Sequence, residues 1–73
     1  MDVYESTMVA EDAFAGLLRR VRAEYLEMPG LQLTTAQAAR LWALDAAVCR
    51  EVLMRLVESH FLVCTPKSVF ARA

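Results

Sequence analysis

The chain has 73 residues, 58% of them hydrophobic, and its formal net charge is −1 at pH 7. This length suffices for one small domain and leaves no room for a second. The near-neutral charge argues against a strongly electrostatic nucleic-acid binder. No apolar run is long enough to span a membrane, and the N-terminus does not resemble a signal peptide. We therefore expect a soluble, cytoplasmic protein without a membrane partner.

The charge is unevenly distributed along the chain. The first fifteen residues contain four acidic residues and no basic one, namely Asp2, Glu5, Glu11 and Asp12. Residues 16–73 hold all eight basic residues and five acidic ones, which gives this part a net charge of +3. The larger part of the chain, which carries the motif described below, is therefore mildly basic.

The first helix is predicted over residues 8–28 and opens a single domain that covers residues 8–73. Residues 1–7 show no clear hydrophobic period, and we expect a short tail there. Apolar residues then recur at intervals of three and four and form one stripe, made of Ala10, Phe14, Leu17, Leu18, Val21, Tyr25 and Met28. The opposite face carries Arg19, Arg20, Ala23 and Glu27. The Pro29-Gly30 pair ends the helix.

A second helix is predicted over residues 34–42. Thr34 and Gln37 have the spacing of a capping box, in which the Thr hydroxyl accepts from the N3 amide and the Gln side chain reaches back. Ala39 provides a small residue where the next helix can cross closely. A short break at residues 43–44 follows.

A third helix is predicted over residues 45–59, and a β-hairpin over residues 61–72. Asp45 is the expected N-cap of the helix, whose apolar positions are Val48, Cys49, Val52, Leu53, Leu56 and Val57. Two short β-prone runs follow, and Pro66 between them suits the second position of a type I turn.

The sequence contains no recognisable catalytic or metal site. Neither Cys49 nor Cys64 has a second cysteine at metal-ligand spacing, and His60 is the single histidine. We interpret both thiols as buried, small hydrophobic groups. Ser59 adjoins His60, but no acidic residue completes a catalytic set. We therefore expect no enzyme activity, no metal and no cofactor.

Two helices joined by a tight turn, with a small residue in the first and a cap on the second, define a helix-turn-helix. The stretch LTTAQAARLWALDAAVCREVLMRLVESHFLV resembles the winged-helix transcription regulators of bacteria, and the resemblance covers residues 33–72. It implies a mainly α fold with a small β-hairpin, in which three helices are followed by a wing. The sequence departs from the family at Ala43 and His60, where the family favours Gly.

The resemblance implies binding to double-stranded DNA. The third helix would present Arg50 and Arg55 to the major groove, where arginine pairs with guanine edges or phosphates. Lys67 and Arg72 would contact phosphates from the wing, and Thr34 would bring a helix end near the DNA backbone. A homodimer is expected, because small winged helices commonly read paired half-sites.

The alternative is a winged-helix module that binds another protein and not DNA. The low basicity and Glu51 on the reading face favour this alternative, and an exposed Met54 beside alanines is typical of a protein interface. Candidate interface residues are Tyr4, Leu26, Ala47 and Met54. Arg19, Arg20 and Arg22 form a further basic cluster, which either contacts phosphate or an acidic partner or pairs locally with Glu24 and Glu27.

Overall fold

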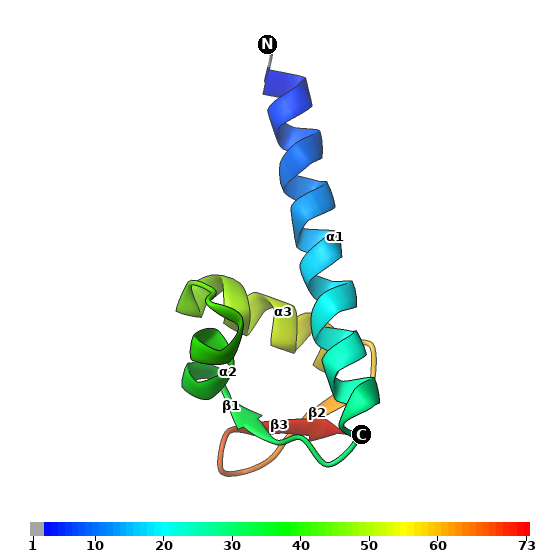
Figure 1. The fold of residues 1–73 in the computed structure, drawn as a ribbon, viewed down its shortest axis with the longest axis vertical. Coiled ribbons are helices and arrows are strands. Elements are labelled where there is room, and N and C mark those ends of the chain that lie inside the picture. Colours follow the sequence, from blue (N-terminus) through cyan, green and yellow to red (C-terminus); the bar gives the residue numbers. More distant parts are fainter. Residues whose placement is uncertain (1–2) are drawn as a thin grey trace.

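The computed structural model describes residues 3–73, and side chains from residue 13 onward. Within this range the chain forms three helices and one small antiparallel sheet (Figure 1). The elements in chain order are α1 (Val3–Glu27), β1 (Leu33–Thr34), α2 (Thr35–Trp42), α3 (Ala46–Glu58), β2 (Leu62–Cys64) and β3 (Val69–Arg72). The mainly helical architecture with a hairpin is therefore confirmed, and the layout is compatible with helices followed by a wing.

Helix α1 is longer than the sequence pattern predicts. It begins at Val3 and not at residue 8, so residues 3–7, expected as a tail, belong to the helix. These residues contain neither Gly nor Pro, and nothing in them stops a helix that has already formed. With 25 residues the helix is about 37 Å long, and Figure 1 shows its N-terminal half extending beyond the other elements.

The apolar stripe of α1 is buried only where the rest of the molecule covers it. Val21 and Tyr25 are fully buried, whereas Phe14, Leu17 and Leu18 are half-buried. Met28, the last member of the predicted apolar stripe, lies just beyond the helix end and is 45% exposed, so the stripe is not buried there. Ala10 lies outside the residues whose side chains are described.

The helix pair α2 and α3 is held by the local hydrogen bonds that the sequence predicts. The Gln37 backbone N–H donates to Thr34 Oγ1 at 3.2 Å, and the Thr34 N–H donates to Gln37 Oε1 at 3.0 Å. Asp45 caps α3 by accepting from the Ala47 N–H at 3.0 Å. Each cap satisfies backbone donors that a helix start leaves free, so both helices have well-defined N-terminal ends.

Two packing details of this pair differ from the prediction. The fully buried alanine of α2 is Ala38, one turn before the buried Trp42, and Ala39 is only half-buried. In α3 the buried stripe consists of Cys49, Val52, Leu53 and Leu56. Val48 lies about 100° around the helix from Cys49, outside this stripe, and is 37% exposed.

Both α2 and α3 end in a left-handed residue that is not glycine. Ala43 has φ 54° and His60 has φ 66°. At each end the two hydrogen bonds of a Schellman motif form, from Ala43 to Arg40 and Leu44 to Ala39, and from His60 to Val57 and Phe61 to Leu56. Without a Cβ, glycine adopts this conformation freely, whereas alanine is strained there by about 1 kcal/mol.

The free energy of unfolding of the Ala43→Gly variant should therefore be about 0.5–1 kcal/mol higher than that of the wild type, because glycine relieves the strain of the left-handed backbone. Urea denaturation followed by circular dichroism measures the change. Ala36→Gly, an alanine-to-glycine change inside α2, is the matched control and should lower the stability by a similar amount. Equal destabilisation by both substitutions would contradict the prediction.

The sheet adds a strand that the sequence pattern does not reveal. Strand order is β1-β3-β2, with Leu33 opposite Phe70 and Leu62 opposite Arg72. In the hairpin turn the Ser68 N–H donates to the Thr65 carbonyl at 2.9 Å, and Ser68 is left-handed at φ 62°. A type I turn followed by a left-handed residue is a common hairpin loop, which confirms a turn around Pro66.

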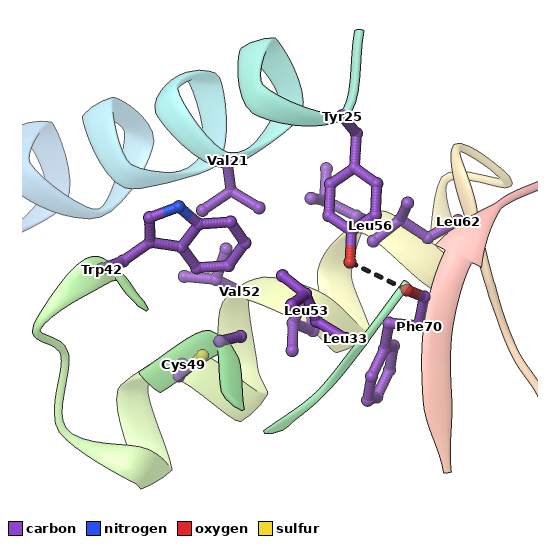
Figure 2. Packing of buried hydrophobic residues seen from close by; sticks show 11 residues of the cluster. Val21, Tyr25, Leu33, Trp42, Cys49, Val52, Leu53, Leu56, Leu62 and Phe70 are labelled. Carbon is purple, nitrogen blue, oxygen red and sulfur yellow. Dashed lines mark hydrogen bonds between the residues drawn. The ribbon is translucent and has the colours of Figure 1, made fainter. Parts of the chain in front are cut away.

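The hydrophobic core lies between α1, the helix pair and the sheet (Figure 2). Its buried members are Val21, Tyr25, Leu33, Ala38, Trp42, Cys49, Val52, Leu53, Leu56, Leu62 and Phe70. The Tyr25 hydroxyl donates to the Phe70 carbonyl at 2.9 Å, so a buried hydrogen bond joins α1 to β3. The core thereby fixes which faces of α1 and α3 remain outside.

Candidate functional site

The outward face of α3 carries two acidic side chains, an alanine and a methionine. Ala47, Glu51, Met54 and Glu58 are exposed and follow one another at intervals of four, three and four, which places them on one face. Arg50 and Arg55 are also exposed, but they are five residues apart and so lie about 140° apart around the helix. The two arginines expected to act together therefore occupy opposite flanks of this face.

Arg50 lies on the flank next to the hairpin. It lines a hollow of about 280 Å³, here named the hairpin groove, together with Thr35, Met54, Cys64, Ser68 and Phe70. Lys67 precedes Ser68 in the exposed hairpin turn. The groove lining therefore contains one cation, Arg50, and Lys67 adjoins the lining residue Ser68 in sequence; none of the six lining residues is acidic.

Arg55 lies on the other flank of α3, facing α1. It lines a second hollow of about 300 Å³, here named the helix groove, together with Leu18, Arg19, Arg22, Leu56 and Ser59. The guanidinium carbon of Arg55 is 5.5 Å from the centre of the Phe14 ring. Three arginines thus line one hollow between α1 and α3.

Phe61 organises the arginines beside the helix groove. The guanidinium carbon of Arg22 lies 4.9 Å from the centre of its ring, and that of Arg72 lies 4.2 Å from it. The Arg72 side chain also donates to the Phe61 carbonyl at 3.5 Å. Stacking on an aromatic ring orients a guanidinium and leaves its positive charge in place.

Arg72 therefore does not lie beside Lys67, although the predicted phosphate contacts from the wing involve both residues. It pairs with Leu62 at the end of the hairpin opposite the turn, because the strands are antiparallel. Of the arginine cluster in α1, Arg19 and Arg22 belong to the helix groove, whereas Arg20 is exposed and does not line it. The spacing of three residues between Arg19 and Arg22 indicates in the sequence that they share a face of α1. Nothing in the sequence indicates that Phe61 packs against Arg22.

The hydroxyl and the backbone N–H of Thr34 are both used to cap α2. Its hydroxyl accepts from Gln37, and its own N–H donates to the Gln37 side chain. Residue 34 also belongs to β1, where it lies opposite Val69. Thr34 therefore connects the start of α2 to the hairpin.

The candidate protein-interface residues whose side chains are described lie on two different helices. Leu26 is 56% exposed at the end of α1, whereas Ala47 and Met54 are exposed on α3. Tyr4 lies outside the residues whose side chains are described. The structure therefore brings together Ala47 and Met54, as their spacing implies, but not Leu26.

The two cysteines have different surroundings. Cys49 is buried, and burial raises the pKa of its thiol, which disfavours the reactive thiolate. Cys64 is exposed, so the prediction that both thiols are buried is wrong for this residue, which is the last residue of β2, next to the hairpin turn. Among residues 13–73, no three His, Cys, Asp or Glu side chains converge on a possible metal position.

None of the helices formed by residues 3–73 has the length and apolar character needed to cross a membrane. Comparison of the chain with protein-family models, with curated proteins and with solved structures found no match.

Proposed function

We propose that this chain is a winged helix-turn-helix protein that binds double-stranded DNA, as a transcriptional regulator or an accessory factor. The support is the order of its elements: α2 and α3 are joined by a tight turn, and a hairpin follows α3 directly and packs against it. In helix-turn-helix proteins the second helix of the pair enters the major groove. In this proposal α3 faces the duplex and the hairpin is the wing.

The hairpin groove is the observation that carries the proposal. Arg50 lines it, Lys67 precedes the lining residue Ser68 in the exposed hairpin turn, and none of the six lining residues is acidic. Two cations on separate elements suit the phosphates on either side of a DNA groove. Glu51 and Glu58 on the outward face would repel phosphate, so we expect the cations Arg50 and Lys67, and not this face, to supply most of the affinity.

Fluorescence anisotropy with random-sequence duplex DNA tests this proposal. The wild type should bind at low salt. The logarithm of its binding constant should fall linearly with the logarithm of the salt concentration, with a slope of about −0.9 per phosphate contact. Arg50→Glu and Lys67→Glu should each weaken binding about tenfold at low salt, because each removes one attraction and adds one repulsion.

Arg20→Glu is the matched control, since it makes the same change of charge at an exposed position away from both grooves. It should weaken binding less than either groove variant. The proposal fails if the wild type does not bind duplex DNA even at low salt. It also fails if Arg20→Glu lowers the affinity as much as Arg50→Glu, because the binding would then depend on net charge alone.

A second candidate function is the recognition of another protein by α3. The exposed Met54 beside Ala47, on a face that also carries Glu51 and Glu58, favours this candidate. Met54→Glu should then abolish capture of a partner, whereas Leu41→Glu, at an exposed leucine of α2, should not. The DNA proposal expects neither effect.

A further inference from the structure

The N-terminal half of α1 lies away from the rest of the chain. Figure 1 shows this half beyond α3, and the fully buried residues of α1, Val21 and Tyr25, both belong to its C-terminal half. Phe14, Leu17 and Leu18 are only half-buried. In proteins most helix stability comes from packing one face against another element, which makes this half of α1 a candidate for packing against another chain.

The helix groove next to α1 selects for a partner with negative charge. Arg19, Arg22 and Arg55 line it together with the apolar side chains of Leu18 and Leu56. An occupant that combines carboxylates with small or apolar residues would match both parts of this lining.

The N-terminal half of α1 in a second copy has this chemistry. The first fifteen residues carry four acidic residues and no basic one. Glu11 precedes Leu18 by seven residues, and Ala15 precedes Arg22 by seven, so these four positions follow the alternating spacing of four and three found at helix–helix seams. Tyr4 and Met8 continue the same spacing towards the N-terminus.

The charges determine the direction of the two helices. A parallel pair would place the acidic ends of both helices together and the arginines together, which is unfavourable. An antiparallel pair places Glu11 of one copy opposite Arg22 of the other, and Ala15 opposite Leu18. The two-fold symmetry repeats both contacts, which is the usual arrangement of a homodimer.

We propose that two copies of this chain form an antiparallel dimer through α1, in which the acidic N-terminal half of each helix occupies the arginine-lined helix groove of the other copy. The dimer rests on α1 and the helix groove and does not depend on DNA binding at the hairpin groove.

Sedimentation velocity over a wide range of protein concentration tests the dimer. The wild type should dimerise, and high salt should weaken the dimer. Glu11→Arg and Arg22→Glu should each weaken dimerisation at least about tenfold, because each places like charges opposite one another. The double variant Glu11→Arg/Arg22→Glu should restore it. Arg20→Glu, off the seam, should dimerise like the wild type.

Recovery in the double variant identifies a contact between copies. Glu11 and Arg22 are eleven residues apart in one helix, about 16 Å along its axis, which is too far for a pair within the chain. Arg22 also stacks on Phe61, so circular dichroism must show that the variants are folded; Glu11→Arg leaves that contact intact. A wild type that stays monomeric at every concentration overturns the proposal, as does a double variant no better than the single ones.

Discussion

Leu53→Ala should lower the free energy of unfolding by about 3 kcal/mol, within the range of about 2–5 kcal/mol typical of buried leucines. Leu53 is fully buried on α3, and Figure 2 shows it in the middle of the core. The cost combines the lost transfer of apolar surface with the cavity that remains, since the surrounding helices and sheet relax only in part.

The relative size of this loss makes it decisive for so short a chain. At about 0.05–0.15 kcal/mol per residue, a domain of 73 residues has a total stability of about 4–11 kcal/mol. Urea denaturation followed by circular dichroism measures the loss. Leu41→Ala, a leucine of α2 that is 54% exposed, is the matched control and should change the stability by less than about 0.5 kcal/mol. Similar losses for both leucines would mean that the core is not where the structure places it.

Alkaline pH should destabilise the protein through Tyr25. Burial raises the pKa of its phenol from 10.0 to about 12, and the nearby Cys49 adds to the effect. Between these two values the unfolded chain has lost the phenolic proton and the folded chain still holds it. The stabilisation is therefore complete below pH 10 and is lost as the pH rises towards 12, and the difference corresponds to about 2–3 kcal/mol.

Tyr25→Phe should remove most of this pH dependence. At neutral pH the variant should be less stable by about 1 kcal/mol, because it lacks the hydrogen bond from the Tyr25 hydroxyl to the Phe70 carbonyl. From pH 10 upward its stability should fall less steeply than that of the wild type. A smaller dependence should remain, since burial also raises the pKa of the Cys49 thiol.

Urea denaturation at a series of pH values between neutral and strongly alkaline measures both slopes. Tyr4→Phe, which removes the other tyrosine of the chain, is the control and should keep the wild-type slope. If Tyr25→Phe keeps it as well, the buried phenol is not the group responsible. The link between α1 and β3 through this hydroxyl would then contribute less than the structure indicates.

The features that depend on neighbouring residues were predictable from the sequence. The capping box of Thr34 and Gln37 and the cap at Asp45 each join residues no more than three positions apart. Ala43, which stands where the resembled family favours Gly, is left-handed at the end of α2. Local hydrogen bonds of this type are determined by side-chain chemistry and spacing, and tertiary contacts need not be known to foresee them.

Features that depend on distant residues were not predictable in the same way. Strand β1 exists because Leu33 meets Phe70, and two residues are too short to show a period of their own. The start of α1 was placed five residues too late, because a helix can continue through a segment without amphipathic character.

In the candidate sites, too, local features followed from the sequence and features between distant residues did not. The sequence by itself determined that a capped helix pair leads into a hairpin, and that acidic residues gather before the arginines of α1. Only the tertiary structure placed Arg50 beside the hairpin and brought Arg55 to Arg19 and Arg22. The reason is physical: spacing specifies which residues share a face of one helix, whereas core packing around Tyr25 and Leu53 decides which face of another element lies against it.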